Sequence, residues 1–184
     1  LERYAESRRA HFQKSSKRSA ADFVTLLLKK RLLSSPAAFA KTLAQHRLTL
    51  EKRDQASPAT AAQMQAAWDR SDDEAGEDES GEAAAEALIT AARGQAALTG
   101  EERDLLNRLG GWVEERRHRP DALAAAMLGW IEETCRTADG GWNNERVIIF
   151  TEYRDTQKWL IDLLLTNGFG GNGGERIATL YGGM

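Results

Sequence analysis

Residues 145–164 read ERVIIFTEYRDTQKWLIDLL, and this stretch decides the fold expected for the end of the chain. Its apolar run VIIF lies in an expected strand at 146–151, and such a run is typical of a strand buried on both faces of a parallel sheet. A helix is expected from about Asp155 to Asn167, because its apolar residues recur at helical spacing. A second strand is expected at 176–181. Together they predict a small C-terminal parallel β-α-β unit with a right-handed crossover.

Two parallel strands alone make an incomplete sheet. Parallel sheets occur inside larger α/β folds, where helices cover both faces and neighbouring strands pair both edges. We therefore expect this chain to be a piece of a larger protein. Its unpaired edge and apolar faces also predict self-association, with a homo-oligomer formed through the incomplete sheet.

The preceding sequence predicts helices, so the expected fold class is mainly α-helical. From Asp22 onward, an amphipathic stripe is formed by Phe23, Leu26, Leu27 and Leu33. Ser35 is the expected N-cap of a second helix that starts at Pro36. The apolar face of that helix carries Phe39, Leu43, His46 and Leu50. His46 has no acidic or cysteine partner at helical spacing, so we interpret it as a packed or surface side chain.

Helical patterns resume at Ala83. Thr99 and Glu102 have the spacing of a capping box, which predicts a helix start there. Another helix is expected to begin at Pro120. Their predicted core positions are Leu105, Leu106, Leu109, Trp112, Val113, Leu123, Met127, Leu128, Trp130 and Ile131. The single cysteine, Cys135, is interpreted as a structural, unreactive thiol.

Charge divides the chain into two unequal halves. Residues 1–53 contain 13 Lys and Arg against 4 Asp and Glu, a net charge of +9, so the remainder carries −12 of the total −3. A basic half indicates either a surface that faces a polyanion or a solvated helix face. The acidic stretch 69–82 predicts a solubilising linker or loop.

Several functional classes lack their sequence signals. No window has the apolar length of a membrane helix, and no signal peptide is recognisable, so a soluble cytoplasmic protein without membrane partners is expected. The glycines of GFGGNGGE, 168–175, follow a helix and precede a strand, the reverse of a dinucleotide-binding loop. No phosphate-binding GxxxxGK[ST] loop, catalytic triad or metal-ligand cluster is present. We predict no catalytic residues and no metal site in this chain.

Three stretches resemble a bacterial Swi/Snf-like ATPase of helicase superfamily two. They are FVTLLLKKRLLSSPAAFAKTL at 23–43, RVIIFTEYRDTQKWL at 146–160, and LYGGM at 180–184. In that family a KKRxxSSPxAF-like helical segment follows the first RecA-like lobe. A variable insertion comes next, and the second lobe then opens with a strand like RVIIFTEY.

The resemblance implies three parts for this chain. Residues 1–53 would be the basic helical segment after the first lobe, 54–139 a helical insertion with the acidic loop, and 140–184 the beginning of the second lobe, a partial RecA-like α/β unit. The intact protein would be an ATP-driven DNA translocase that uses ATP and Mg²⁺. This chain, which lacks the nucleotide-binding motifs, is expected to be inactive alone and to hold no cofactor.

The resemblance also implies nucleic-acid contacts. Strand ends of the second lobe touch phosphates in similar proteins, which assigns this role here to Thr151, Arg154, Gly182 and Gly183. The basic half adds Lys29, Lys30 and Arg31 as candidate phosphate contacts. The expected partners are DNA, bound weakly and without sequence preference, and the rest of the parent helicase. Two alternatives remain open. In the first, Thr151 only caps the following helix and Arg154 is a surface cation. In the second, Lys29, Lys30 and Arg31 form ion pairs with the neighbouring lobe and do not meet DNA. At the level of the whole chain, the alternative is a stand-alone helical adaptor without enzymatic activity.

Overall fold

The computed structural model describes residues 1–10, 15–51, 62 and 97–180. This part of the chain is mainly α-helical, as expected. Its helices are α1 (Glu2–Ala10), α2 (Ser15–Ser34), α3 (Pro36–Glu51), α6 (Gly100–Arg116), α7 (Ala122–Cys135) and α8 (Arg154–Thr166). The acidic segment 69–82 and the Gly182–Gly183 turn lie outside the described residues. None of the described helices has the length and apolar character needed to cross a membrane.

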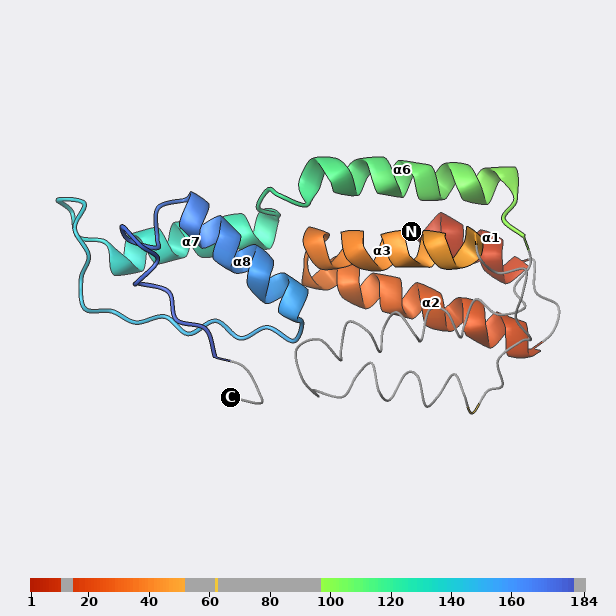
Figure 1. The fold of residues 1–184 in the computed structure, drawn as a ribbon, viewed down its shortest axis with the longest axis horizontal. Helices are drawn as coiled ribbons and strands as arrows, with labels where there is room; N and C mark the ends of the chain where they lie inside the picture. The colour runs from red at the N-terminus through yellow and green to blue at the C-terminus, as the bar shows by residue number, and fades with distance from the viewer. Residues whose placement is uncertain (11–14, 52–61, 63–96, 181–184) are drawn as a thin grey trace.

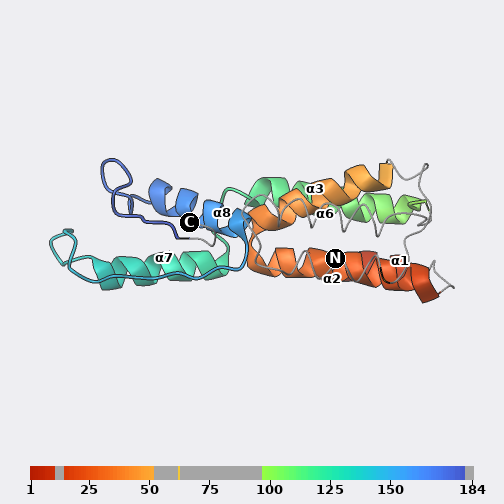
Figure 2. The same ribbon diagram turned by 60° about the horizontal axis from the view of Figure 1, so that its bottom comes forward.

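Helices α1, α2, α3 and α6 lie together at one end of the molecule (Figures 1 and 2). Helices α2 and α3 form an antiparallel hairpin whose turn lies near the middle of the molecule, with α6 alongside. The core between them is built from Tyr4, Val24, Leu27, Leu28, Phe39, Leu43, Leu50, Leu106 and Val113. One apolar cluster therefore joins all four helices into a single bundle.

Local signals explain where the bundle helices begin. Between α2 and α3 stands only Ser35, whose hydroxyl accepts a hydrogen bond from the Ala38 amide at 3.1 Å, as an N-cap does. Helix α6 opens with the predicted capping box: the Thr99 hydroxyl accepts from the Glu102 amide at 3.2 Å, and the Glu102 carboxylate accepts from the Thr99 amide at 2.9 Å. Both predicted starts are confirmed.

Two buried polar pairs tie α1 to the bundle. Arg8 and Glu102 form an ion pair of 3.3 Å, and both side chains are almost fully buried. The Tyr4 hydroxyl lies 2.7 Å from Nε2 of His46. Burial and the nearby Arg8 lower the pKa of His46 to about 3, so the ring is neutral. The interpretation of His46 as a packed side chain is confirmed.

Helices α7 and α8 form the other end of the molecule (Figure 1). Leu128, Ile131, Cys135 and Phe169 make one small cluster there, and Ala124, Trp159 and Leu163 make a second. Helix α7 is capped by Asp121, whose carboxylate accepts from the Ala124 amide at 2.8 Å, so it starts just after the predicted Pro120. The thiol of Cys135 is free and buried, which agrees with a structural role.

Two parts of the predicted apolar faces are wrong. In α2, Leu26 and Leu33 are exposed, and the buried face instead runs through Val24, Leu27, Leu28 and Arg31. In the other helices, Trp112, Leu123 and Trp130 were expected in the core and are also exposed. Periodicity alone misplaced the face of α2 because a buried arginine counts as polar in such a pattern.

The two strands of the predicted β-α-β unit do not form within the described residues. Helix α8 is present at nearly the expected bounds, but residues 146–151 are extended without pairing, and so are 177–180. The pairing found in this part of the chain is an isolated antiparallel bridge between Arg136 and Trp142. A strand needs a neighbour for its backbone hydrogen bonds, and no described segment forms such bonds with 146–151.

Candidate functional site

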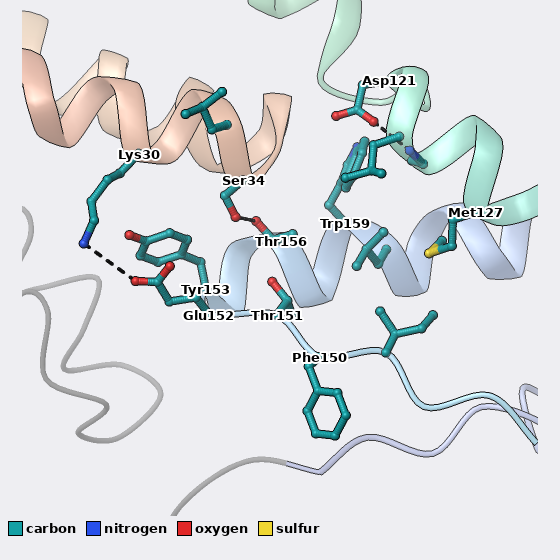
Figure 3. Close-up of a pocket in the computed structure, with 15 residues that line it drawn as sticks. Lys30, Ser34, Asp121, Met127, Phe150, Thr151, Glu152, Tyr153, Thr156 and Trp159 are labelled. Carbon is teal, nitrogen blue, oxygen red and sulfur yellow. Dashed lines mark hydrogen bonds and ion pairs between the residues drawn. The ribbon is translucent and has the colours of Figure 1, made fainter.

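Four of the seven predicted site residues lie where the α2–α3 turn contacts the first turn of α8 (Figures 1 and 3). We call this region the junction and define it by Arg31, Ser34, Ser35, Tyr153 and Thr156. The first three come from the KKRLLSSP stretch and the last two from TEYRDT. These are two of the three stretches on which the family resemblance depends.

Three hydroxyl groups form the centre of the junction. Oγ1 of Thr156 lies 2.6 Å from Oγ of Ser34 and 2.9 Å from Oγ of Ser35. Ser35 and Thr156 are buried, and 121 residues separate them in the sequence. Buried hydroxyls need partners, and here each supplies one for another. These contacts therefore fix a long-range packing arrangement.

Arg31 forms the second part of the junction. Its side chain is only 3% exposed, and its guanidinium carbon lies 3.9 Å from the centre of the Tyr153 ring. Tyr153 is itself buried and occupies the N-cap position of α8. Burial lowers the pKa of Arg31 and raises that of Tyr153. An arginine nevertheless stays protonated in a protein, so the contact is a desolvated cation over an aromatic face.

Ion pairs border the junction. Nζ of Lys30 lies 3.8 Å from a carboxylate oxygen of Glu152, and Nζ of Lys41 lies 3.0 Å from one of Asp155. Both pairs connect the α2–α3 hairpin to residues at the start of α8. At least one member of each pair is well exposed, so each stabilises the contact only slightly.

A cavity of about 430 Å³ opens beside the junction (Figure 3). Most of its lining is apolar and comes from α2, α7, α8 and the extended segment 146–151; Leu33, Met127, Ile149, Trp159 and Leu160 are among the lining residues. Phe150 also borders the cavity, but its ring points away from the other lining residues and is 90% exposed (Figure 3). Nε1 of Trp159 is buried and has no hydrogen-bond partner among the described residues.

The structure brings together four of the seven predicted nucleic-acid contacts. Lys30 and Thr151 line the same cavity, Arg31 stacks on Tyr153, and Arg154 is the first residue of α8, where it hydrogen-bonds Gln157. Lys29 points elsewhere, because its ammonium group pairs with Glu2 of α1 at 2.7 Å. Gly182 and Gly183 lie outside the described residues.

Two features bear on anion binding at this place. Tyr153 makes no side-chain hydrogen bond to the first turn of α8, so that turn has no side-chain N-cap. Amide groups at a helix start attract phosphate oxygens. Against this, the acidic Glu152 and Asp155 lie in the same segment and repel anions. Phosphate binding here therefore depends on the nearby cations outweighing these two carboxylates.

The hydroxyl cluster was not predicted as part of the site. From sequence, Ser35 was identified only as a cap, and Ser34 and Thr156 carried no distinctive signal. Hydroxyl residues are common at helix ends, so nothing local distinguishes one that bonds across 121 residues. Within the described ranges, no three His, Cys, Asp or Glu side chains are placed to hold a metal ion.

Comparisons of the chain with protein-family models, with curated proteins and with solved structures found no match.

Proposed function

We propose that this chain belongs to an ATP-dependent DNA translocase of the Swi/Snf-like type, in which it couples the two lobes and contacts DNA. One observation carries the proposal. The KKRLLSSP and TEYRDT stretches resemble two different motifs of the family and are far apart in the sequence, and they pack against each other at the junction. In a two-lobe motor such a contact would connect the segment after the first lobe to the start of the second. ATP and Mg²⁺ would be bound by other parts of the parent protein, and its location would be cytoplasmic.

The β-α-β unit belongs to this proposal. Residues 146–151 would pair with further strands of a RecA-like lobe, with 176–181 as the second strand of the unit. In support, Val147 packs against the small α7 cluster, whereas Ile148, Ile149 and Phe150 are all exposed, which leaves apolar side chains for further elements of a larger lobe to cover. Among the described residues, no backbone–backbone hydrogen bond involves residues 146–151.

Self-association through this segment is a further part of the proposal. Ile148, Phe150 and Leu180 expose large apolar surfaces, and the backbone of 146–151 forms no backbone–backbone hydrogen bond with another described residue. Such a segment is a template for a strand of a second copy. Light scattering should show oligomers whose fraction grows with concentration, and Ile148→Lys combined with Phe150→Lys should return the chain to a monomer. A wild-type chain that stays monomeric at high concentration would contradict this part.

DNA contact would come from Lys29 and Lys30 of α2, with Thr151 and Arg154 at the start of α8 and the Gly182–Gly183 turn. Arg31, predicted as a phosphate contact together with these lysines, is only 3% exposed and would reach a phosphate only if the residues that cover it moved. Lys29 and Lys30 are about one-third exposed, 34% and 32%, so phosphates can reach their ammonium groups. Their present partners, Glu2 and Glu152, are more exposed, and such surface pairs are weak enough to exchange for a phosphate.

The same pairs favour a second candidate, a helical adaptor without nucleic-acid binding. Lys30 pairs with Glu152 in the part expected to open the second lobe, as the ion-pair alternative describes, whereas Lys29 pairs with Glu2 of α1 and Arg31 lies over the Tyr153 ring. In the adaptor, the basic residues would serve the internal packing of the chain. The two functions therefore differ in whether the exposed cations bind a polyanion.

Filter binding to a short DNA duplex at low salt separates the two functions. Reversal of both exposed lysines, Lys29→Glu with Lys30→Glu, should weaken binding and reduce the salt dependence by about 0.9 counterion for each lost phosphate contact. The matched control reverses two exposed cations of the same charge, Arg116 at the end of α6 and Arg119 in the turn that follows it. Equal losses from both double variants, or no binding by the wild-type chain, would favour the adaptor.

A further inference from the structure

The three consecutive cations of α2 have different environments. Lys29 and Lys30 are about one-third exposed, whereas Arg31 is 3% exposed and covers the face of Tyr153. A phosphate cannot approach a buried guanidinium without moving the residues that cover it. Phosphate binding therefore does not explain why Arg31 lies buried against Tyr153.

We infer that Arg31 is a positioning residue: it stacks on Tyr153 and, together with the Ser34–Thr156 hydroxyl contact, anchors the start of α8 to the end of α2. The inference deepens the coupling part of the proposed function by naming the residues that couple the two segments. It concerns the chain itself and holds whether or not DNA binds.

The spacing of the contacts explains why the anchor is rigid. Arg31 and Ser34 are three residues apart on α2, so they lie one above the other on the same face. Tyr153 and Thr156 have the same spacing at the start of α8. The Arg31–Tyr153 and Ser34–Thr156 contacts therefore hold the end of α2 and the start of α8 at two separate points. Two points prevent both sliding and rotation of one helix against the other, whereas a single contact would allow rotation. Ser35 adds a third hydroxyl at the turn.

Because of the position of Tyr153, the anchor also orients the segment that precedes α8. Tyr153 is the residue at which the extended segment 146–152 becomes helix α8. Fixing this residue sets the direction in which the extended segment leaves the helix. It thereby places Thr151 and Glu152 beside the cavity and Lys30. A shift of α2 would carry the end of this segment with it.

The planar shape of the Arg31 guanidinium, and not its charge alone, suits it to the contact with the Tyr153 ring. A guanidinium stacks flat on an aromatic ring and carries a weaker hydration shell than an ammonium, so it loses less on burial. If Arg31 acted only as a cation for phosphate, lysine would replace it. If it acts by stacking on Tyr153, lysine will not.

The test follows amide hydrogen exchange of α8 in the 184-residue chain without nucleic acid. Tyr153→Phe keeps the ring, and Tyr153→Leu keeps apolar volume but removes the ring. We expect exchange in α8 to stay within about twofold of wild type for the first variant and to rise roughly tenfold for the second, which lies between the values typical of exposed and of desolvated cation–π contacts. Helix α6, which contributes no junction residue, is the internal reference and should be unchanged.

The variant Arg31→Lys changes the other partner of the same contact while keeping its charge. It should raise exchange in α8 to about the level of Tyr153→Leu, and the double variant should add little, because both changes remove one contact. Equal exchange for the Phe and Leu substitutions of Tyr153 would overturn the inference. An equal rise in α6 would also overturn it, since that result means general loss of stability. If Tyr153→Leu does not fold, Thr156→Ser and Thr156→Val give the same comparison at the hydroxyl contact.

The outcomes of this test and of the DNA-binding test are separable. Failure of the lysine reversals to affect DNA binding would remove DNA contact and leave the anchor intact. Failure of the exchange experiment would remove the anchor and leave the surface lysines as candidate DNA contacts.

Discussion

The helical bundle and the extended segment 146–151 satisfy their backbones and apolar side chains in opposite ways. In the bundle, hydrogen bonds form within each helix, and one core cluster covers the apolar faces of α1, α2, α3 and α6. In the extended segment, Ile148 and Phe150 are exposed and the backbone has no partner among the described residues. A helix completes its hydrogen bonds locally, whereas a strand depends on distant sequence. The bundle therefore forms from local hydrogen bonds and one core, whereas no sheet forms among the described residues.

The largest expected effect contrasts two phenylalanines, one from each region. Phe39 is fully buried in the bundle and packs edge-on against Trp112, while Phe150 is 90% exposed. Phe39→Ala should lower the free energy of unfolding by about 4 kcal/mol, because it leaves a cavity. Phe150→Ala should change it by less than about 0.5 kcal/mol. Urea denaturation followed by circular dichroism measures both, and a large loss from Phe150→Ala would show that the segment is packed in solution.

The second effect concerns the buried ion pair of the bundle. Glu102 pairs with Arg8 and also completes the capping box with Thr99. Glu102→Ala leaves the buried Arg8 without this carboxylate and should cost about 3 kcal/mol. Glu101→Ala, at the exposed neighbouring position, is the control and should cost less than about 0.5 kcal/mol. Similar losses from the two variants in urea denaturation would mean that the ion pair does not form.

The third effect depends on pH and arises from His46. The unfolded ring has a pKa of about 6.5 and the folded ring about 3, so the unfolded chain binds the extra proton between these values. Stability from this residue is complete above about pH 6.5 and falls as the pH is lowered toward 3. Between pH 7 and pH 4.5 the expected loss is about 2–3 kcal/mol.

His46→Gln provides the control for this loss. Carboxylates titrate in both proteins, so only the difference between the two pH profiles reports on His46. The profile of the variant should be flatter between pH 6.5 and pH 4.5. Parallel profiles would contradict the buried, neutral ring and its contact with Tyr4.

The comparison of the two regions also explains what the sequence could predict. Short-range signals predicted the start of α6 at Thr99 and the cap at Ser35, because each depends on residues within one turn. Helix α8 was predicted from the helical spacing of its own apolar residues. The face of α2 was misplaced at Leu33, since its buried side includes Arg31. The contact of Ser34 with Thr156 spans 122 residues and leaves no local pattern. The candidate cations were found from charge, but only packing distinguishes the buried Arg31 from the exposed lysines.

The smallest expected effect lies at the boundary between the regions. Lys41 of α3 pairs with Asp155 of α8 at 3.0 Å, but the lysine side chain is 63% exposed. Water and salt screen such a pair, so Lys41→Gln should lower stability by no more than about 0.5 kcal/mol. Raising the salt concentration to about 1 M should remove even this difference, because the Debye length then falls to about 3 Å. Urea denaturation at low and high salt measures it. A loss above about 1.5 kcal/mol that persists in salt would place Lys41 among the anchors of α8, and the stacking of Arg31 would then no longer suffice to explain how the two regions are held together.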